Sequence, residues 1–287
     1  MTGSPTTSRV RATSPDRLSP IPPGDAASAP ETALPVSTPD NPSSSSNPDP
    51  AAVLPPADSR FQERTDLVHS ALTGSLLATA GGFLDAFTYT AHGHVFANAM
   101  TGNVILLGVS CVSHNWHTGL RHLPPIAAFL CGICSARGIH LYAERRGLRF
   151  PYLAVLLLEL ATLGVLSLLP QATRDFWITT SIAFAASVQV ATFRQVNGHG
   201  YSSTFTTGNL RTLGEAIFDW IFAERKPETL RRVEDFAMIC GAFFFGALLG
   251  AIVTPHMGNR ALWVDMAFLF AVAVRLAWQN RRDAEAS

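Results

Sequence analysis

The sequence predicts an all-α integral membrane protein with six transmembrane helices, two short broken or re-entrant helices and an inverted internal repeat. The 287 residues are 47% hydrophobic and only 15% charged, against roughly a quarter charged in an ordinary soluble domain. Long apolar stretches recur along the chain, and the chain resembles itself at an offset of 106 residues. Because 21 basic residues balance 21 acidic ones, we expect no nucleic-acid partner.

The first part of the chain differs in composition from the rest. Thirteen of the 19 prolines precede Arg60, and a run of four serines occupies residues 43–46. Such a segment has too little apolar surface to offset the entropy of ordering it, so residues 1–67 are predicted to be a disordered Ser/Pro-rich tail. A polytopic membrane domain is predicted over residues 68–280, followed by a short C-terminal tail at 281–287.

Eight apolar stretches follow the tail, and each predicts a helix. Six are long enough to cross a bilayer, which takes about 20 residues with roughly 17 as the lower limit. The second and the sixth are short or carry polar and charged residues. The alternative is a large soluble α-protein, whose deep core would have to hold helices that are apolar all round. The stretches are 71–91, 97–112, 125–143, 152–169, 176–196, 205–223, 236–254 and 261–278.

The two unusual stretches occupy matching places in the chain. The offset of 106 residues aligns Thr101-Gly102-Asn103 with Thr207-Gly208-Asn209, and an offset of 109 aligns Cys131-Gly132 with Cys240-Gly241. Self-similarity of this kind is typical of internal repeats. The membrane domain is therefore predicted to contain two copies of a four-segment unit, at about 71–170 and 176–279.

The charges of the loops favour six crossings over eight, because Lys and Arg gather on the cytoplasmic side. With eight crossings, the loop that holds Arg145 and Arg146 would face outward. If the second segment of each unit enters the membrane without crossing it, only Arg121, Arg174 and Arg260 remain outside. Three crossings per unit invert one unit relative to the other, as in many secondary transporters. We expect a plasma-membrane location with both termini in the cytoplasm.

Both Thr-Gly-Asn tripeptides stand at the start of a predicted short helix. The first turn of a helix presents unpaired N–H groups and the positive end of its dipole, which can bind an anion or a polar solute. Interrupted segments in corresponding positions point to the binding site of such folds. The alternative is that both tripeptides only turn the chain and let helices pack closely. The candidate solute-binding residues here are Asn98, Thr101, Gly102, Asn103, Thr207, Gly208 and Asn209.

Ionisable residues inside predicted spans supply the other candidates. Asp85 lies within the first span, and it is the leading candidate for a proton or cation site, since ionisable groups at membrane depth are usually functional. Its alternative role is a structural hydrogen bond to a neighbouring helix. Glu159 and Asp265 are weaker candidates. Gln189 lies near the position that matches Asp85, and Arg211 could bind an anion or pair with Glu215 one turn away.

Other motifs give no cofactor, metal site or catalytic residue. The spacing of His114, His117 and His122 matches no strong metal template, so these histidines are expected in a solvated loop. A face of small residues suits close helix contact within one protomer or in a homo-oligomer. It comprises Ala242, Gly246 and Gly250.

The run from Gly82 to Tyr89, followed by the run from His94 to Val104, resembles the YoaK-like membrane proteins, a bacterial and fungal family of unknown function. Thr207-Gly208-Asn209-Leu210 resembles the second copy of the family's motif. The resemblance covers about residues 68–280. It implies a polytopic membrane protein, and it implies no substrate or reaction. Asp85 and the two Thr-Gly-Asn tripeptides match the motif positions.

Taken together, these features favour a small-solute transporter or exchanger with its site between the two Thr-Gly-Asn half-helices. The expected partners are the lipid bilayer and a small polar or anionic solute, with proton coupling through Asp85. One alternative is a non-catalytic oligomeric scaffold. The other is an intramembrane enzyme, although no nucleophile and base are paired by spacing.

Overall fold

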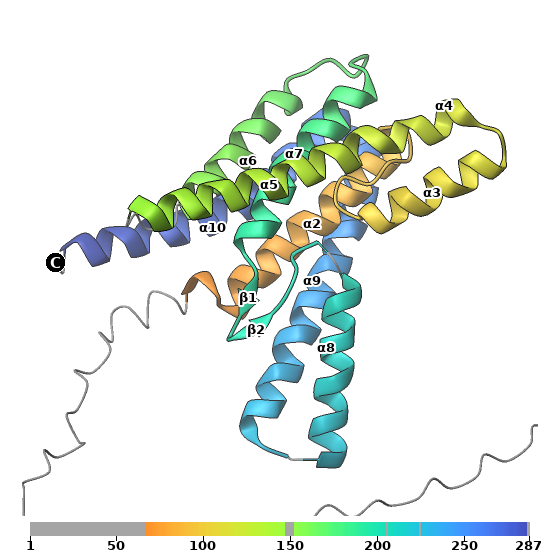
Figure 1. Ribbon diagram of the computed structural model, residues 1–287. Helices are drawn as coiled ribbons and strands as arrows, with labels where there is room; N and C mark the ends of the chain where they lie inside the picture. Colours follow the sequence, from red (N-terminus) through yellow and green to blue (C-terminus); the bar gives the residue numbers. More distant parts are fainter. Residues whose placement is uncertain (1–66, 147–151, 205, 224, 286–287) are drawn as a thin grey trace, which may run out of the picture. The chain divides into compact units, whose positions relative to one another are not determined.

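The computed structural model describes residues 67–146, 152–204, 206–223 and 225–285, and its helices follow the predicted segments closely (Figure 1). Nearly all of the predicted Ser/Pro-rich tail lies outside the described residues. The helices are α2 (Ala71–Ala91), α3 (Met100–Val112), α4 (Trp116–Gly119), η1 (Leu120–His122), α5 (Leu123–Arg146), α6 (Tyr152–Ser167), α7 (Asp175–Thr192), α8 (Thr206–Phe218), η2 (Asp219–Ala223), α9 (Pro227–Met257), η3 (Gly258–Ala261) and α10 (Leu262–Glu285).

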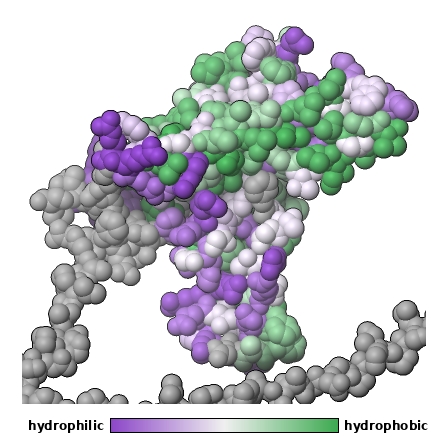
Figure 2. Space-filling model, viewed as in Figure 1, coloured by the Kyte–Doolittle hydropathy of each residue, from purple (hydrophilic) through white to green (hydrophobic). Residues whose placement is uncertain are grey.

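Two continuous helical stretches are long and apolar enough to cross a membrane. They run over Trp116–Arg146 and Pro227–Arg282. Large apolar side chains on these helices face outward, with Leu130, Phe244 and Phe270 each at least 60% exposed. Figure 2 shows apolar residues gathered over α5 and α3, and hydrophilic residues over the region where α9 begins. An apolar surface of this extent is typical of a protein that faces lipid.

The helices pair across the two halves of the chain. The most extensive contacts join α2 to α9 and α5 to α7, while α6 packs against α10 and α7. A core of buried apolar side chains is shared by α2, α6, α7 and α10, and includes Phe83, Leu156, Ile182 and Leu269. Each half therefore depends on helices of the other half to bury its apolar faces.

Glycines allow α2 and α9 to approach closely. A Cβ atom added to Gly246 would collide with the carbonyl oxygen of Thr79, and one added to Gly82 would collide with that of Phe243. At Gly250 it would lie 2.7 Å from the carbonyl oxygen of Phe83. The small-residue face of α9 thus packs against α2 of the same chain. A second copy could reach these glycines only by displacing α2.

The apolar stretch at 176–196 is helical only as far as Thr192, which corrects the longer helix expected from its composition. Residues Gln195–Val196 (β1) and His199–Gly200 (β2) form a small antiparallel hairpin. Its turn is Asn197-Gly198, with φ angles of 47° and 81°, and Asn-Gly is the favoured sequence for a tight hairpin turn. The Asn197 N–H donates to the carbonyl oxygen of His69 at 2.7 Å, so the hairpin is fixed to the start of α2.

Candidate functional site

Two asparagines hold the loops that precede the short helices α3 and α8. The Asn103 side chain donates to the Phe96 carbonyl oxygen at 2.7 Å and accepts from the Phe96 N–H at 2.9 Å. The Asn209 side chain does the same to Ser202, at 2.7 and 3.2 Å. In both cases the partner lies seven residues earlier in the chain. The last residue of each Thr-Gly-Asn motif thus fixes a loop of the same geometry in each half.

The first of these loops is bound to α2 through Asp85. One carboxylate oxygen, Oδ1, accepts hydrogen bonds from the N–H groups of Asn98 at 2.7 Å and Ala99 at 3.2 Å. The Asn98 side chain donates to the carbonyl oxygen of Gly81 at 3.3 Å. Asp85 is 5% exposed and Asn98 is fully buried. The carboxylate therefore binds the backbone at the start of α3, one turn along α2 from Gly81.

The second loop reaches the same turn of α2 from the other half of the chain. A Cβ atom on Gly81 would lie 2.6 Å from the Ser203 carbonyl oxygen and 3.0 Å from the methyl group of Thr204. The Ser203 hydroxyl group donates to Oε1 of Gln189 on α7 at 3.3 Å. Gly81 is thus the place where both loops meet, and only a residue without a side chain leaves room for them.

Several polar atoms around Gly81 are buried and have no hydrogen-bond partner within the described part of the chain. They are Oδ2 of Asp85, Oδ1 of Asn98, Nε2 of Gln189 and Oγ1 of Thr204. An unmade hydrogen bond of a buried group costs about 1–3 kcal/mol, so buried groups of this kind normally have a partner. The set contains acceptors, an amide donor and a hydroxyl group. It can therefore bind a small polar solute or water.

A family model described as "Protein of unknown function (DUF1275)" matches residues 73–275. The chain belongs to this family. This match confirms the family resemblance carried by the motifs around Asp85 and Thr101. The matched region includes both loops and every residue of the polar cluster at Gly81.

Two relatives of this family member are named as transmembrane proteins. The UPF0700 transmembrane protein YoaK of Bacillus subtilis (strain 168) is 28% identical over 203 residues, which are 69% of this chain and 90% of that protein. The UPF0700 transmembrane protein RA0705 of Rhizobium meliloti (strain 1021) is 27% identical over 106 residues, 35% of this chain and 45% of that protein. No solved structure matches. These relatives and the two long apolar stretches make this family member a membrane protein.

The residues singled out in the sequence fall into three groups in this family member. Asp85, Asn98 and Gln189 lie together in the buried cluster around Gly81. Asn103 and Asn209 hold the loops. The remaining candidates lie in the first turns of α3 and α8: Gly102 is half-buried against the Phe96 ring, and Thr101, Thr207, Gly208 and Arg211 are exposed.

Arg211 is paired with a carboxylate. Its Nε atom lies 2.9 Å from Oε1 of Glu215, one turn further along α8. The pairing one turn away that the sequence allowed is therefore present. Both side chains are largely exposed, and such surface pairs contribute little stability.

Sequence reasoning missed Gly81, Ser203 and Thr204 as members of the cluster. A signal for Thr204 was present, because the offset of 106 residues places Thr204 opposite Asn98. His122 was expected in a solvated loop, and this was wrong. Its side chain is 2% exposed, and its Nδ1 atom lies 3.2 Å from Oδ1 of Asn103. The ring is buried because η1 leads directly into α5 beside α3.

Glu159 on α6 and Asp265 on α10 form a second buried polar pair. They are 1% and 0% exposed, and they lie on helices that pack against each other. Oε2 of Glu159 and both carboxylate oxygens of Asp265 have no hydrogen-bond partner among the described residues. Ionisable groups at membrane depth are usually functional, so these two carboxyl groups stay candidates beside the cluster at Gly81.

Proposed function

We propose that this protein is a plasma-membrane transporter or exchanger of a small polar solute, which binds where the two loops meet at Gly81. The convergence of unpartnered polar atoms from both halves of the chain, around one glycine, carries the proposal. A rigid structural contact would gain stability by pairing these atoms with one another. A solute that binds reversibly needs polar atoms that form no hydrogen bonds to one another when the site is empty. Asp85 would couple this movement to a proton or a cation.

We also propose that the chain crosses the membrane six times as two inverted repeats, with both termini in the cytoplasm. The helix pairs support this arrangement: α2 and α7 hold matching places in the two repeats, as do α5 and α9. The observed contacts, α2 with α9 and α5 with α7, are equivalent under exchange of the repeats. The two loops held by Asn103 and Asn209 are likewise equivalent under exchange of the repeats. Such symmetry is typical of transporters that bind solute between their repeats.

Cysteine labelling in intact cells tests the six-crossing topology. Single cysteines would replace Ser113, Arg146, Thr173 and Glu228, one at a time, in a background without the four native cysteines. We expect a membrane-impermeant thiol reagent to label positions 113 and 173 in intact cells, and positions 146 and 228 only after the cells are opened. Labelling of position 146 in intact cells would contradict the inverted arrangement.

A second experiment tests solute access without knowledge of the solute. Thr204 is 3% exposed and its hydroxyl group has no partner among the described residues, so a cysteine there should leave the fold intact. If the cluster opens to water during a transport cycle, a small impermeant methanethiosulfonate reagent should modify Thr204→Cys slowly from at least one side. An oligomeric scaffold with a static interior would leave this cysteine unmodified.

The matched control for this experiment is Ser187→Cys. Ser187 is fully buried on α7, two residues before Gln189, but its side chain lies in the contact with Gly132 of α5. A packed helix contact should exclude the reagent throughout the cycle. Equal reaction rates at positions 187 and 204 would indicate general unfolding and would count against a solute pathway at Gly81.

A further inference from the structure

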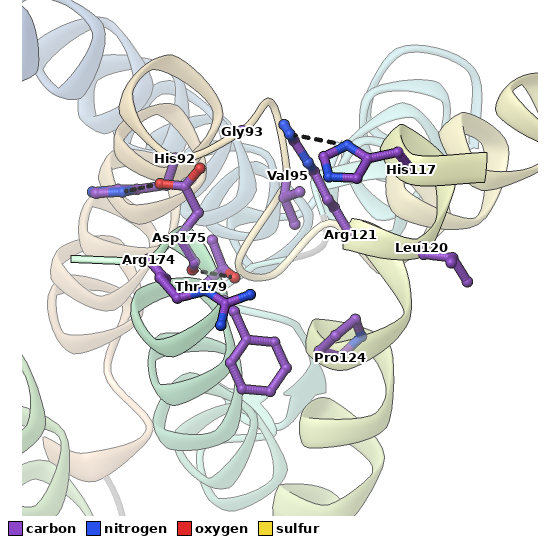
Figure 3. A pocket seen from close by; sticks show the side chains of 11 residues that line it. His92, Gly93, Val95, His117, Leu120, Arg121, Pro124, Arg174, Asp175 and Thr179 are labelled. Carbon is purple, nitrogen blue, oxygen red and sulfur yellow. Dashed lines mark hydrogen bonds and ion pairs between the residues drawn. The ribbon is translucent and has the colours of Figure 1, made fainter. Parts of the chain in front are cut away.

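A separate cavity of about 450 Å³ lies between the loop after α2 and the starts of α5 and α7 (Figure 3). Arg121 and Arg174 both line it, together with His92, His117 and Asp175. It contains none of the residues that surround Gly81. In the six-crossing arrangement proposed above, this cavity opens on the outer side of the membrane.

The two arginines of this cavity carry positive charge that no carboxylate neutralises at ion-pair distance among the described residues. Arg121 instead lies 3.3 Å from Nδ1 of His117. A guanidinium group can only donate hydrogen bonds, so Nδ1 of His117 is the acceptor in this contact. His117 thus orients Arg121 without neutralising its charge by an ion pair.

Asp175, the carboxylate that lines the cavity, is bound to His92. Oδ1 of Asp175 lies 3.1 Å from Nδ1 of His92, and Nε2 of His92 lies 3.1 Å from Oδ1 of Asn259. The Asn259 amide group donates to the Leu169 carbonyl oxygen at 3.1 Å, which fixes its oxygen toward His92. Both nitrogens of His92 therefore face side-chain oxygen atoms, one of them from Asp175. This contact fixes one oxygen of Asp175 toward His92 and away from the two arginines.

The backbone keeps the space between these groups open. Gly93 has a φ angle of 74°, which residues with a side chain rarely adopt. A Cβ atom there would lie 3.2 Å from Oδ2 of Asp175 and 3.6 Å from Nη1 of Arg121. The cavity is also next to the first turn of α7, whose free N–H groups and dipole favour negative charge. Two arginines and the start of α7 thus favour an anion, and one carboxylate, that of Asp175, opposes it.

We propose that this cavity binds a small anion through Arg121 and Arg174, with a carboxylate or phosphate group as the ligand. Arginine suits these groups because its planar donors match their pairs of oxygens. The same chemistry is offered by a soluble anion and by the head group of an anionic lipid. The site does not require that a solute crosses the membrane, so it holds or fails independently of the transport proposal.

Binding to the purified protein in neutral detergent tests this site. The probes are sodium phosphate and sodium succinate, measured by calorimetry and by the melting temperature against sodium chloride of equal ionic strength. We expect both probes to bind, and Arg121→Gln or Arg174→Gln to weaken binding about tenfold or more, as for the loss of a charged hydrogen bond. Arg121→Lys keeps the charge and should retain part of the binding.

The matched control is Arg260→Gln. Arg260 is an exposed arginine on η3 at the same end of the helices, but it does not line the cavity, so this variant should bind both probes like the unmodified protein. Nanodiscs with phosphatidylglycerol or with phosphatidylcholine identify a lipid ligand. If only phosphatidylglycerol stabilises the protein, and only while Arg121 and Arg174 are present, the anion is a head group. The proposal would be overturned if the Arg121, Arg174 and Arg260 variants bound phosphate, succinate and phosphatidylglycerol with equal affinity.

Discussion

Replacing Gly246 with leucine should lower the melting temperature of the purified protein by roughly 2–12 °C. A side chain at this position collides with the backbone of α2 at Thr79, which cannot move without separating the two helices. Overpacking of a close contact costs about 1–3 kcal/mol, and each kcal/mol corresponds to about 2–4 °C in a domain of this size. Thermal unfolding in detergent, followed by fluorescence-detected size exclusion, measures the change.

Gly241→Leu is the matched control for this variant. Gly241 lies on the same helix, and a Cβ atom there would meet nothing within 4 Å, so this substitution should leave the melting temperature within about 1–2 °C, as is usual for surface changes. The oligomeric-scaffold alternative makes a different prediction, in which Gly246→Leu yields a smaller particle of undiminished stability. That result would contradict the role of Gly246 as a contact within the chain.

Replacing Asp85 with asparagine should abolish the pH dependence of solute uptake while the protein stays folded. An asparagine side chain keeps an oxygen that can accept from the N–H groups of Asn98 and Ala99, but it cannot take up or release a proton in the transport cycle. Uptake into proteoliposomes, compared between acidic and alkaline buffers, measures the effect. Uptake that still depends on pH in the asparagine variant would contradict a coupling role for Asp85.

Asp85→Leu separates the structural role of Asp85 from the coupling role. Leucine removes the acceptor of two buried backbone N–H groups. Each unmade hydrogen bond costs about 1–3 kcal/mol, so this variant should lose roughly 2–6 kcal/mol of stability and express poorly. If the leucine variant is as stable as the asparagine variant, the hydrogen bonds to the loop contribute little to the fold.

Apolar periodicity and length predicted the helices well because lipid-facing and core-facing helices both need long apolar runs. The stretch at 71–91 has the same bounds as α2. One exception is α9, which begins at Pro227, nine residues before the apolar run at 236–254, because its first turns are polar. Another is α7, where the apolar run continues beyond Thr192 into the strand β1. Val196 is buried there in a small cluster with Ala78 and Ile239. Composition alone does not distinguish a buried strand residue from a helical one, whereas the Asn197-Gly198 pair did contain the turn signal.

The candidate site could be predicted only in part. Asp85, Asn98 and Gln189 stand out because polar residues are costly inside apolar segments. The role of Gly81 could not be predicted, because the approach of Ser203 to α2 is set by helix packing between distant parts of the chain. The same is true of His92 and Asp175, which are 83 residues apart. No local sequence pattern indicates that two residues so far apart in the chain are in contact.

The contact between α2 and α9 also constrains how the chain can be made. The end of α2 at Ala91 and the start of α9 at Pro227 are separated by the 135 residues 92–226. At the usual rate of synthesis, α2 leaves the ribosome on the order of ten seconds before its partner exists. During this interval the face around Gly82 has no final neighbour, whereas the loop that binds Asp85 follows α2 directly. The closest helix contact of the protein therefore joins an early segment of the chain to a late one.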